Sequence, residues 1–360
     1  MFNKKEINTG NQFEFDVAKS FAVIFMILIH TFEHMTDIKG TILPITVEFL
    51  GGAPAACIFM IAMGLGMVYT KHNSPKNFAL RGITLLLMAY ALNFFRETLP
   101  VLVGEILHIE NRFDGESLLK TLANVDILHF AGIAFLFIAL MKKLKIKPMV
   151  ILSITILLNA IGSLCIGLFD GTPEVVQYLA GLFVFTNHDT AFPAFQWLIY
   201  PAVGMCFGLM LKHVSDKKAF YRILFISGIV SLISVTSGSI STGLDVSSFF
   251  NSDEYYMQKY ITLLWCMSIV AVIIPLYYTV SCKIKGKIES GVKFISKNVN
   301  HIYIIQWLVI GYSIAIMELL DMNLLPSYWG IPVGLIITGF CILLCILWNI
   351  GKQTLSRNKN

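Results

Sequence analysis

Charged residues are scarce in this chain: they make up 14% of its 360 residues, whereas 56% are hydrophobic. No polar stretch is long enough to form a soluble domain, and no period-two alternation of apolar residues suggests a transmembrane β-barrel. The apolar residues fall instead in repeated runs of roughly 20, the length of a helix that crosses a bilayer. With a mean hydropathy of +0.73, these features predict an all-α, polytopic integral membrane protein.

Other absences exclude further classes. The seven cysteines lie almost wholly inside apolar runs and no pair has the spacing of a zinc site, so we interpret them as core residues and expect no metal. No small-residue cleavage site follows the first apolar run, which predicts a retained anchor. The formal net charge of +5 is spread over short loops, so it does not indicate a nucleic-acid-binding surface. No internal repeat is visible, which weighs against an inverted-repeat transporter.

Ten runs have the length and composition of transmembrane helices. In chain order they cover residues 14–35, 44–70, 78–95, 126–142, 148–169, 194–212, 221–242, 260–281, 299–320 and 329–350. Residues 1–13 are then a cytoplasmic leader, 14–350 a single transmembrane domain and 351–360 a cytoplasmic tail.

The distribution of Lys and Arg over the loops predicts the orientation. Of the 27 basic residues, 21 lie in the two terminal segments and in every second loop, and the intervening loops hold five. This alternation predicts an even number of spans with both termini in the cytoplasm.

Abundant Lys, Asn and Ile and the lack of sorting signals favour a bacterial plasma membrane. Four tryptophans near span ends are interpreted as interface anchors: Trp197, Trp265, Trp307 and Trp329.

The first span, FEFDVAKSFAVIFMILIHTFEH, carries ionisable residues at both ends. Asp16 and Lys19 lie toward the cytoplasm. His30, Glu33 and His34 lie toward the outside. Eleven residues separate Lys19 from His30, about 16 Å along a helix. Because ionisable groups inside a membrane are costly, they mark candidate functional sites, and we expect the function to reside in this span.

Polar residues also occur in the outer half of other spans. Glu48 lies one turn into the second span and precedes the small residues 51–56, which allow another helix to approach closely. Asp126 and His129 are three residues apart, hence on one helix face. An alternative interpretation is a secondary transporter or permease with an intramembrane relay. The relay would consist of Asp16, Lys19, His30, Glu48, Asp126 and His129.

Five segments resemble the transmembrane acyltransferase superfamily, which includes the acyltransferase-3 family and the heparan-α-glucosaminide N-acetyltransferase-like branch. DVAKSFAVIFMILIH, from Asp16 to His30, resembles the first-helix pattern D-x-x-R-x-x-A…H. Three segments are more similar to the second branch: GAPAACIFMIAMGLGM followed by LRGITLLL, DILHFAGIAFL, and FPAFQWLIYPAVGMCFG. Near the C-terminus, NHIYIIQWLVI resembles a further motif of that branch. Three positions depart from the family patterns, because Lys19 replaces an Arg, Gln196 a Pro and Gln306 a frequent His.

The resemblance implies acyl transfer across the membrane. Family members take an acyl group, usually acetyl, from a cytoplasmic acyl-CoA and place it on a hydroxyl or amine of a sugar or similar acceptor on the far side. We therefore expect acetyl-CoA as donor substrate, an extracytoplasmic glycan or small molecule as acceptor, the lipid bilayer as environment, and no nucleic-acid partner. A homo-oligomer is compatible with the sequence.

The ionisable residues can be assigned to the acceptor side and to the donor side of this reaction. Because histidine can both accept a proton and carry an acyl group, His30 is the expected general base on the acceptor or the carrier of the acyl group. Either Glu33 or Glu48 would orient its ring. His129 is a second candidate base. The phosphates of CoA would be attracted at the cytoplasmic side by Lys19, Arg81 and the basic loops 71–81 and 142–147, and Asp16 is assigned to the same donor site.

Overall fold

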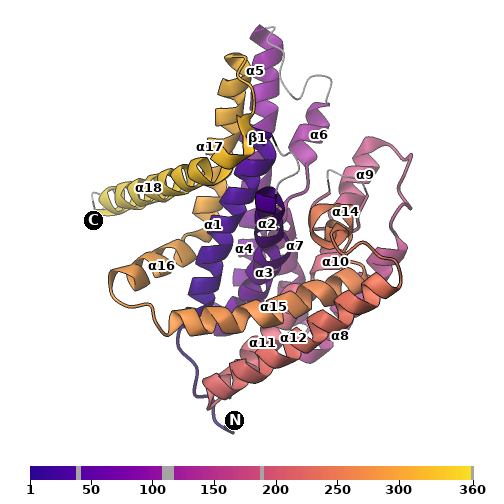
Figure 1. Ribbon diagram of the computed structural model, residues 1–360, viewed down its shortest axis with the longest axis vertical. Helices are drawn as coiled ribbons and strands as arrows, with labels where there is room; N and C mark the ends of the chain where they lie inside the picture. Colours follow the sequence, from indigo (N-terminus) through magenta and orange to yellow (C-terminus); the bar gives the residue numbers. More distant parts are fainter. Residues whose placement is uncertain (38–41, 108–116, 187–189, 358–360) are drawn as a thin grey trace.

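The computed structural model describes residues 1–37, 42–107, 117–186 and 190–357 (Figure 1). In chain order its helices are α1 (Phe13–Met35), α2 (Ile42–Gly51), α3 (Ala53–Tyr69), α4 (Pro75–Asn93), α5 (Leu99–Leu107), α6 (Leu118–Ala123), α7 (Ile127–Lys143), α8 (Pro148–Leu164), α9 (Glu174–Gly181), α10 (Ala194–Trp197), α11 (Ile199–Lys212), α12 (Lys217–Ser241), α13 (Ser248–Asn251), α14 (Asp253–Met257), α15 (Tyr260–Ser281), α16 (Lys287–Lys297), α17 (Val299–Leu319) and α18 (Gly330–Arg357). The other elements are the π-helix η1 (Phe94–Thr98), the 3-10 helix η2 (Ser327–Trp329), and two short parallel strands, β1 (Thr36–Asp37) and β2 (Leu325–Pro326).

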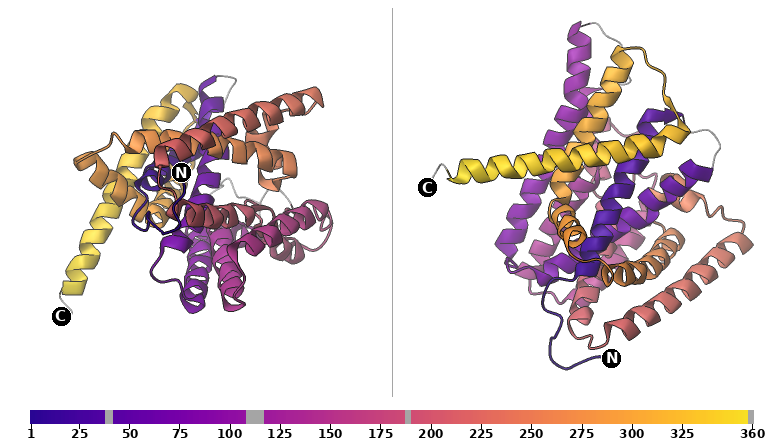
Figure 2. Two further views of the ribbon diagram at one scale, coloured as in Figure 1. Left: turned by 90° about the horizontal axis from the view of Figure 1, so that it is seen from below. Right: turned by 60° about the vertical axis from the view of Figure 1, so that its left-hand side comes forward.

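Helix α1 lies at the centre of the bundle, where it contacts α2, α3, α15, α16, α17 and α18 (Figures 1 and 2). In its most apolar 18-residue window 72% of the residues are buried, against 11% in the corresponding window of α12. The surface of α1 is therefore enclosed by protein, whereas α12 faces the surroundings. Polar residues of α1 must accordingly meet other helices or line an internal cavity.

The all-α polytopic architecture is confirmed. Within the described ranges, eight helical segments are long and apolar enough to cross a membrane. The other two predicted spans correspond to α7 and α8, which have 17 residues each. A helix of this length extends about 26 Å, close to the hydrocarbon thickness of about 30 Å.

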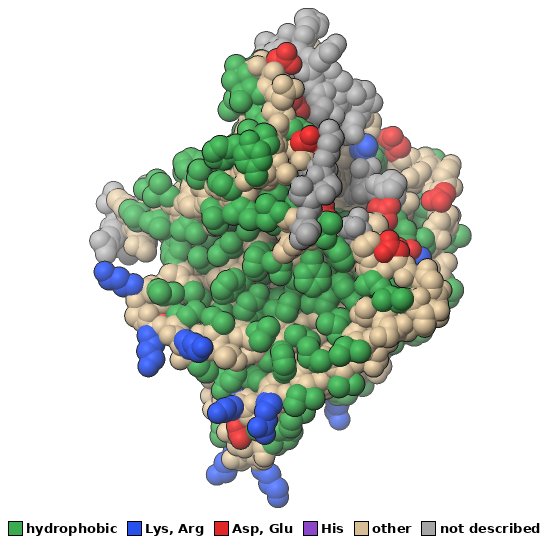
Figure 3. Space-filling model, in the orientation of Figure 1, with side chains coloured by type: hydrophobic (Ala, Val, Ile, Leu, Met, Phe, Trp, Pro, Cys, Tyr) green, Lys and Arg blue, Asp and Glu red, His purple; other side chains and the backbone are tan. Residues whose placement is uncertain are grey.

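Charge is separated along the molecule in the way that a membrane protein requires. In Figure 3, most Lys and Arg side chains lie along the lower and left edges, and most Asp and Glu side chains lie at the top and right. A broad hydrophobic surface lies between them. We call these regions the basic end and the acidic end. Helix α1 begins at the basic end, beside the N-terminus, and runs toward the acidic end (Figures 1 and 3).

The third span differs from the prediction. Helix α4 continues through η1 into α5, so that one apolar segment covers residues 75–106. Arg96 and Glu97, assigned to an outer loop from the sequence, lie in η1 with only 5% and 8% of their surface exposed. Arg96 Nη2 lies 2.6 Å from Glu97 Oε1, and this pairing offsets part of the cost of burying the two charges.

The second predicted span is divided at Gly52 into α2 and α3. As expected, its small residues allow a close approach of another helix. A Cβ atom on Gly51 would lie 2.6 Å from Cβ of Ile29 and 2.8 Å from the carbonyl oxygen of Phe25, both in α1. Glycine at this position therefore brings the chain into close contact with α1 at Phe25 and Ile29.

Helices α3 and α11 pack through a second pair of glycines. A Cβ atom on Gly64 would lie 1.9 Å from the carbonyl oxygen of Pro201, and one on Gly204 would lie 2.1 Å from that of Ile61. The backbones thus touch where neither helix has a side chain. Small residues at such contacts are how membrane helices reach close packing.

Replacing Gly64 with Ala is expected to destabilise the bundle by roughly 1–3 kcal/mol, because the added methyl group must push the two backbones apart. The measurement is thermal unfolding of the purified protein in detergent. Gly66→Ala is the matched control on the same helix, since a Cβ atom there would have nothing within 4 Å. Equal melting temperatures for the two variants would contradict the proposed packing.

Candidate active site

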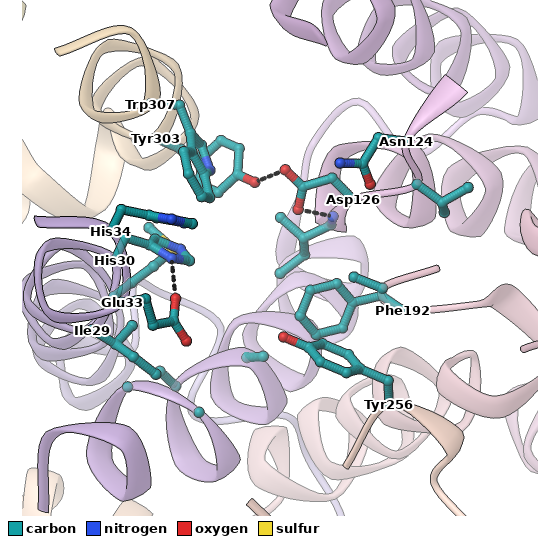
Figure 4. Close-up of a pocket in the computed structure, with 18 of the residues that line it drawn as sticks. Ile29, His30, Glu33, His34, Asn124, Asp126, Phe192, Tyr256, Tyr303 and Trp307 are labelled. Atoms are coloured by element: carbon teal, nitrogen blue, oxygen red, sulfur yellow. Dashed lines mark hydrogen bonds and ion pairs between the residues drawn. The ribbon is translucent and has the colours of Figure 1, made fainter. Parts of the chain in front are cut away.

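A cavity of about 530 Å³ lies beside the last two turns of α1, and we call it the His30 cavity. The residues that line it come from α1, α2, α3, η1, α6, α7, α14, α17 and the loops before α7 and α10. In Figure 4, His30, Glu33 and His34 lie on one side, opposite Asp126 and the aromatic rings of Phe192 and Tyr256. The ionisable residues predicted at the outer end of the first span therefore face one cavity.

The imidazole of His30 is held by its own helix. Its Nδ1 lies 3.1 Å from Oε2 of Glu33, three residues further along α1 (Figure 4). The side chain of His30 is 20% exposed, which gives it access to the cavity. The sequence left open whether Glu33 or Glu48 contacts this ring. Glu33 makes the contact, and Glu48 does not line the His30 cavity.

Trp307 on α17 covers the other side of the imidazole. The two ring centroids are 4.2 Å apart, and the guanidinium carbon of Arg96 lies 4.3 Å from the centroid of the indole ring.

The prediction of an interface anchor was thus wrong for Trp307, which belongs to the cavity wall. It was also wrong for Trp197 and Trp265, which are 0% and 5% exposed. Position near a span end does not reveal whether an indole faces lipid or protein.

Arg96 is the centre of a buried ionic network that the sequence did not predict. Its Nη2 contacts Glu97 and Oδ1 of Asn93, and its Nη1 lies 3.4 Å from Oδ2 of Asp126. Tyr303 donates a hydrogen bond to the same carboxylate oxygen (Figure 4). The sequence offered one signal for this network: Arg96 and Glu97 are two ionisable residues at the end of an apolar run. Ionisable residues inside a membrane are costly, so they mark candidate functional sites.

His129 does not join the cavity. It is fully buried, and its Nδ1 accepts a hydrogen bond from the backbone N–H of Asp126 at 3.2 Å. In return, Oδ1 of Asp126 accepts from the N–H of Ile127, so that the two side chains cap the first turn of α7. The i, i+3 pair seen in the sequence therefore forms a capping box, and His129 lines neither of the cavities described here.

The aromatic side of the His30 cavity is formed by Phe192, Tyr255 and Tyr256. Tyr256 lies in the short helix α14, and burial raises the pKa of its phenol above the ordinary value. The hydroxyl is therefore protonated at neutral pH and is available as a hydrogen-bond donor. Aromatic faces beside polar groups can bind a ligand that has both apolar and hydroxyl surfaces.

A second cavity, of about 630 Å³, lies nearer the basic end, and we call it the Lys19 cavity. Lys19, Arg81 and Lys297 line it together with His72 and His301, and the described lining residues include no carboxylate. The two cations predicted to bind the donor thus share one cavity. Methionines provide much of the apolar lining: Met26, Met60, Met63 and Met67.

Asp16 supports Lys19 from outside this cavity. Its Oδ1 lies 3.3 Å from Nζ of Lys19, and its carboxylate accepts hydrogen bonds from Asn11 and Ser296. Asp16 is buried and does not line the Lys19 cavity. Of the six residues considered for a transporter relay, Asp16, Glu48 and His129 line neither of the two cavities described here.

The two cavities are adjacent. Among the described side chains, four line both of them: Met26, Phe59, Ile127 and Tyr303. They come from α1, α3, α7 and α17, so each of these helices contributes one residue to the partition. His30 lies one turn beyond Met26 on α1, directly on the acidic-end side of the partition.

The comparison with known families gives one match. The family described as "Heparan-alpha-glucosaminide N-acetyltransferase, catalytic" matches residues 12–241, more than half of the chain. No match is found among curated proteins or among solved structures. The matched segment includes His30, Lys19 and Arg81, whereas Tyr303 and Trp307 lie beyond it. From this match, the chain belongs to the heparan-alpha-glucosaminide N-acetyltransferase catalytic family and is a membrane acetyltransferase.

Proposed function

We propose that this protein moves an acetyl group from acetyl-CoA in the Lys19 cavity to a hydroxyl or amine of an extracytoplasmic glycan or related acceptor in the His30 cavity. The observation that carries the proposal is the partition itself. Two cavities of opposite character meet at four side chains, and the candidate catalytic imidazole lies next to them. Only the layer formed by these four side chains separates a thioester in the Lys19 cavity from His30.

The charges support this assignment of donor and acceptor. CoA carries several phosphate charges, and the Lys19 cavity is lined by three cationic side chains and by no described carboxylate, although Lys19 pairs with Asp16 behind it. The basic end faces the cytoplasm under the positive-inside rule, and acetyl-CoA is a cytoplasmic metabolite. The His30 cavity, with its acidic and aromatic lining, suits a neutral or amino-bearing sugar better than a polyanion.

The chemistry centres on His30. With Nδ1 hydrogen-bonded to Glu33, the neutral ring has its lone pair on Nε2. As a base, Nε2 takes the proton of the acceptor while the acceptor oxygen or nitrogen attacks the thioester carbonyl, and the CoA thiolate then leaves. As an acyl carrier, Nε2 itself attacks the thioester carbonyl and the CoA thiolate leaves; the acceptor then attacks the acetyl group, the bond from Nε2 to the acetyl carbon breaks, and the acceptor proton passes to solvent. Glu33 stabilises the positive charge that develops on the ring in both routes.

The experiment that tests the function compares surface glycans from cells with and without the gene by mass spectrometry. Deletion is expected to remove an acetyl increment from one glycan class, and expression of the wild-type chain is expected to restore it. Unchanged spectra, together with no transfer from acetyl-CoA by purified protein in nanodiscs, would overturn the proposal.

CoA binding provides a direct test against the transporter alternative. A ligand present at 100 times its dissociation constant stabilises the folded protein by about 2.7 kcal/mol. We therefore expect CoA to raise the melting temperature of the purified protein. A permease for an unrelated solute would show no such shift.

Replacing Lys19 or Arg81 with Ala is expected to raise KM for acetyl-CoA roughly tenfold, because each variant loses one charge-assisted contact with phosphate. The effect should shrink at high salt, which screens the wild-type contact as well. Lys218→Ala is the control, since Lys218 is exposed near the basic end and does not line the cavity. A KM that is unchanged in both cavity variants would place the donor elsewhere.

A further inference from the structure

The outer end of α1 holds a second arrangement that acetyl transfer does not require. His30, Glu33 and His34 each present a ligand atom, and these atoms all lie within 4.8 Å of one another. The spacing i, i+3, i+4 places the three side chains on one face of the helix. All three line the His30 cavity, so a solute in that cavity has access to them (Figure 4).

Two imidazoles and one carboxylate are a donor set for transition-metal dications such as Zn²⁺. Mg²⁺ and Ca²⁺ prefer ligand sets made of oxygen atoms. Bonds from zinc to nitrogen and oxygen measure about 2.0–2.2 Å, so two ligands of one tetrahedral ion are roughly 3.4 Å apart. Small changes in side-chain torsion angles would bring atoms that are at most 4.8 Å apart to this spacing. The cavity would supply the remaining coordination position.

The electrostatic environment also favours a cation at this point. Among the described lining residues, three carboxylates (Glu33, Glu97 and Asp126) outnumber two cationic side chains. The two cations are Arg96 and Lys120, and Arg96 is paired with Glu97 and Asp126. Helix α1 ends at Met35, so its last turn carries the negative end of the helix dipole. The carboxylates of the cavity and the C-terminal end of α1 would therefore both attract a dication bound beside His34.

We propose that His30, Glu33 and His34 form a binding site for a transition-metal dication of the zinc class, and that the bound ion inhibits acetyl transfer. The site departs from the expectation of a metal-free protein, which was based on the spacing of the cysteines. Inhibition rests on the proposed function: a nitrogen of His30 that ligates a metal ion has no free lone pair with which to accept a proton or an acetyl group. Metal binding itself does not depend on that function.

The test is a titration of the full chain in nanodiscs with Co²⁺, which reports its coordination through visible absorption. We expect one Co²⁺ per chain, displaced by Zn²⁺. His34→Ala should weaken Co²⁺ binding by at least about tenfold. Loss of a residue that only hydrogen-bonds to a metal ligand already costs about that much, and His34 would be a ligand itself. Glu33→Gln keeps the shape of the side chain but removes its charge, and it should also weaken binding. His213→Ala is the matched control, because His213 lies at the basic end beside Asn3.

Two outcomes would overturn the site: no Co²⁺ spectrum with the wild-type chain, or equal affinity in the wild type, His34→Ala and Glu33→Gln. In a parallel assay, Zn²⁺ is expected to inhibit acetyl transfer and EDTA to restore it. If the chain binds Co²⁺ but shows no transfer even after EDTA has removed the metal, the proposed function is contradicted and the site stands. Transfer without Co²⁺ binding would contradict the site and leave the function standing.

Discussion

Replacing His30 with Ala is expected to lower the rate of acetyl transfer by about 10²–10⁴-fold, the contribution typical of a general acid–base group. The imidazole lies in the His30 cavity next to the partition, with Glu33 on one nitrogen and Trp307 against its face. His34, the other imidazole of α1 that lines this cavity, lies one turn further from the partition, so we do not expect it to replace His30. The measurement is transfer from labelled acetyl-CoA by purified protein in nanodiscs.

Controls separate loss of chemistry from loss of fold. His213→Ala removes an imidazole at the other end of the molecule and should leave the rate unchanged. CoA should still stabilise His30→Ala against heat, since His30 does not line the Lys19 cavity. Full transfer activity in a folded His30→Ala protein would refute the assignment.

The same reaction distinguishes the two chemical routes. If His30 carries the acetyl group, labelled acetyl-CoA should release one equivalent of CoA per protein before any acceptor is added. If His30 acts only as a base, CoA release should require the acceptor. Glu33→Gln should slow either route, by less than His30→Ala does, because the ring retains its place against Trp307.

Replacing Arg96 with Met is expected to destabilise the protein by about 3–5 kcal/mol, the cost of leaving buried partners without their counter-charge. Glu97 and Asp126 both pair with this guanidinium, whose side chain is only 4% exposed. The indole of Trp307 would lose its cationic neighbour at the same time. Thermal unfolding and the yield of monodisperse protein in detergent measure the effect.

Neutralising a partner should reverse part of this loss. In the double variant Arg96→Met with Asp126→Asn, one of the two uncompensated carboxylates is removed, so its stability should exceed that of Arg96→Met alone. Arg96→Lys keeps the charge but loses the planar fork, and it should lie between wild type and Arg96→Met. A stability of Arg96→Met equal to that of wild type would show that the network contributes nothing to the fold.

Much of the site on α1 follows from local sequence. Asp16, Lys19, His30 and Glu33 stand out because each is ionisable inside an apolar run, and helical spacing alone places Glu33 beside His30. The choice between Glu33 and Glu48 depended on how α2 packs against α1. Spacing was also ambiguous for His129, because an i, i+3 pair at a helix start is equally suited to catalysis and to capping.

The partners of His30 from other helices were not predictable. Trp307 is far away in the chain, and its sequence context is that of an ordinary interface tryptophan. Arg96 followed an apolar run and was assigned to a loop, because a single sequence does not show which carboxylates will meet it. The π-helix η1 and the packing of α17 bring these groups together.

Run length and charge distribution by themselves determined that the chain is a helical membrane protein with basic and acidic ends. The physical reason is that lipid leaves each spanning segment to satisfy its own backbone hydrogen bonds, so each helix is a local property. The rotation of every helix about its axis, and hence which side chains face one another, is decided by contacts between distant segments. The partition between the two cavities takes one residue from each of four helices, and only the tertiary structure could assemble it.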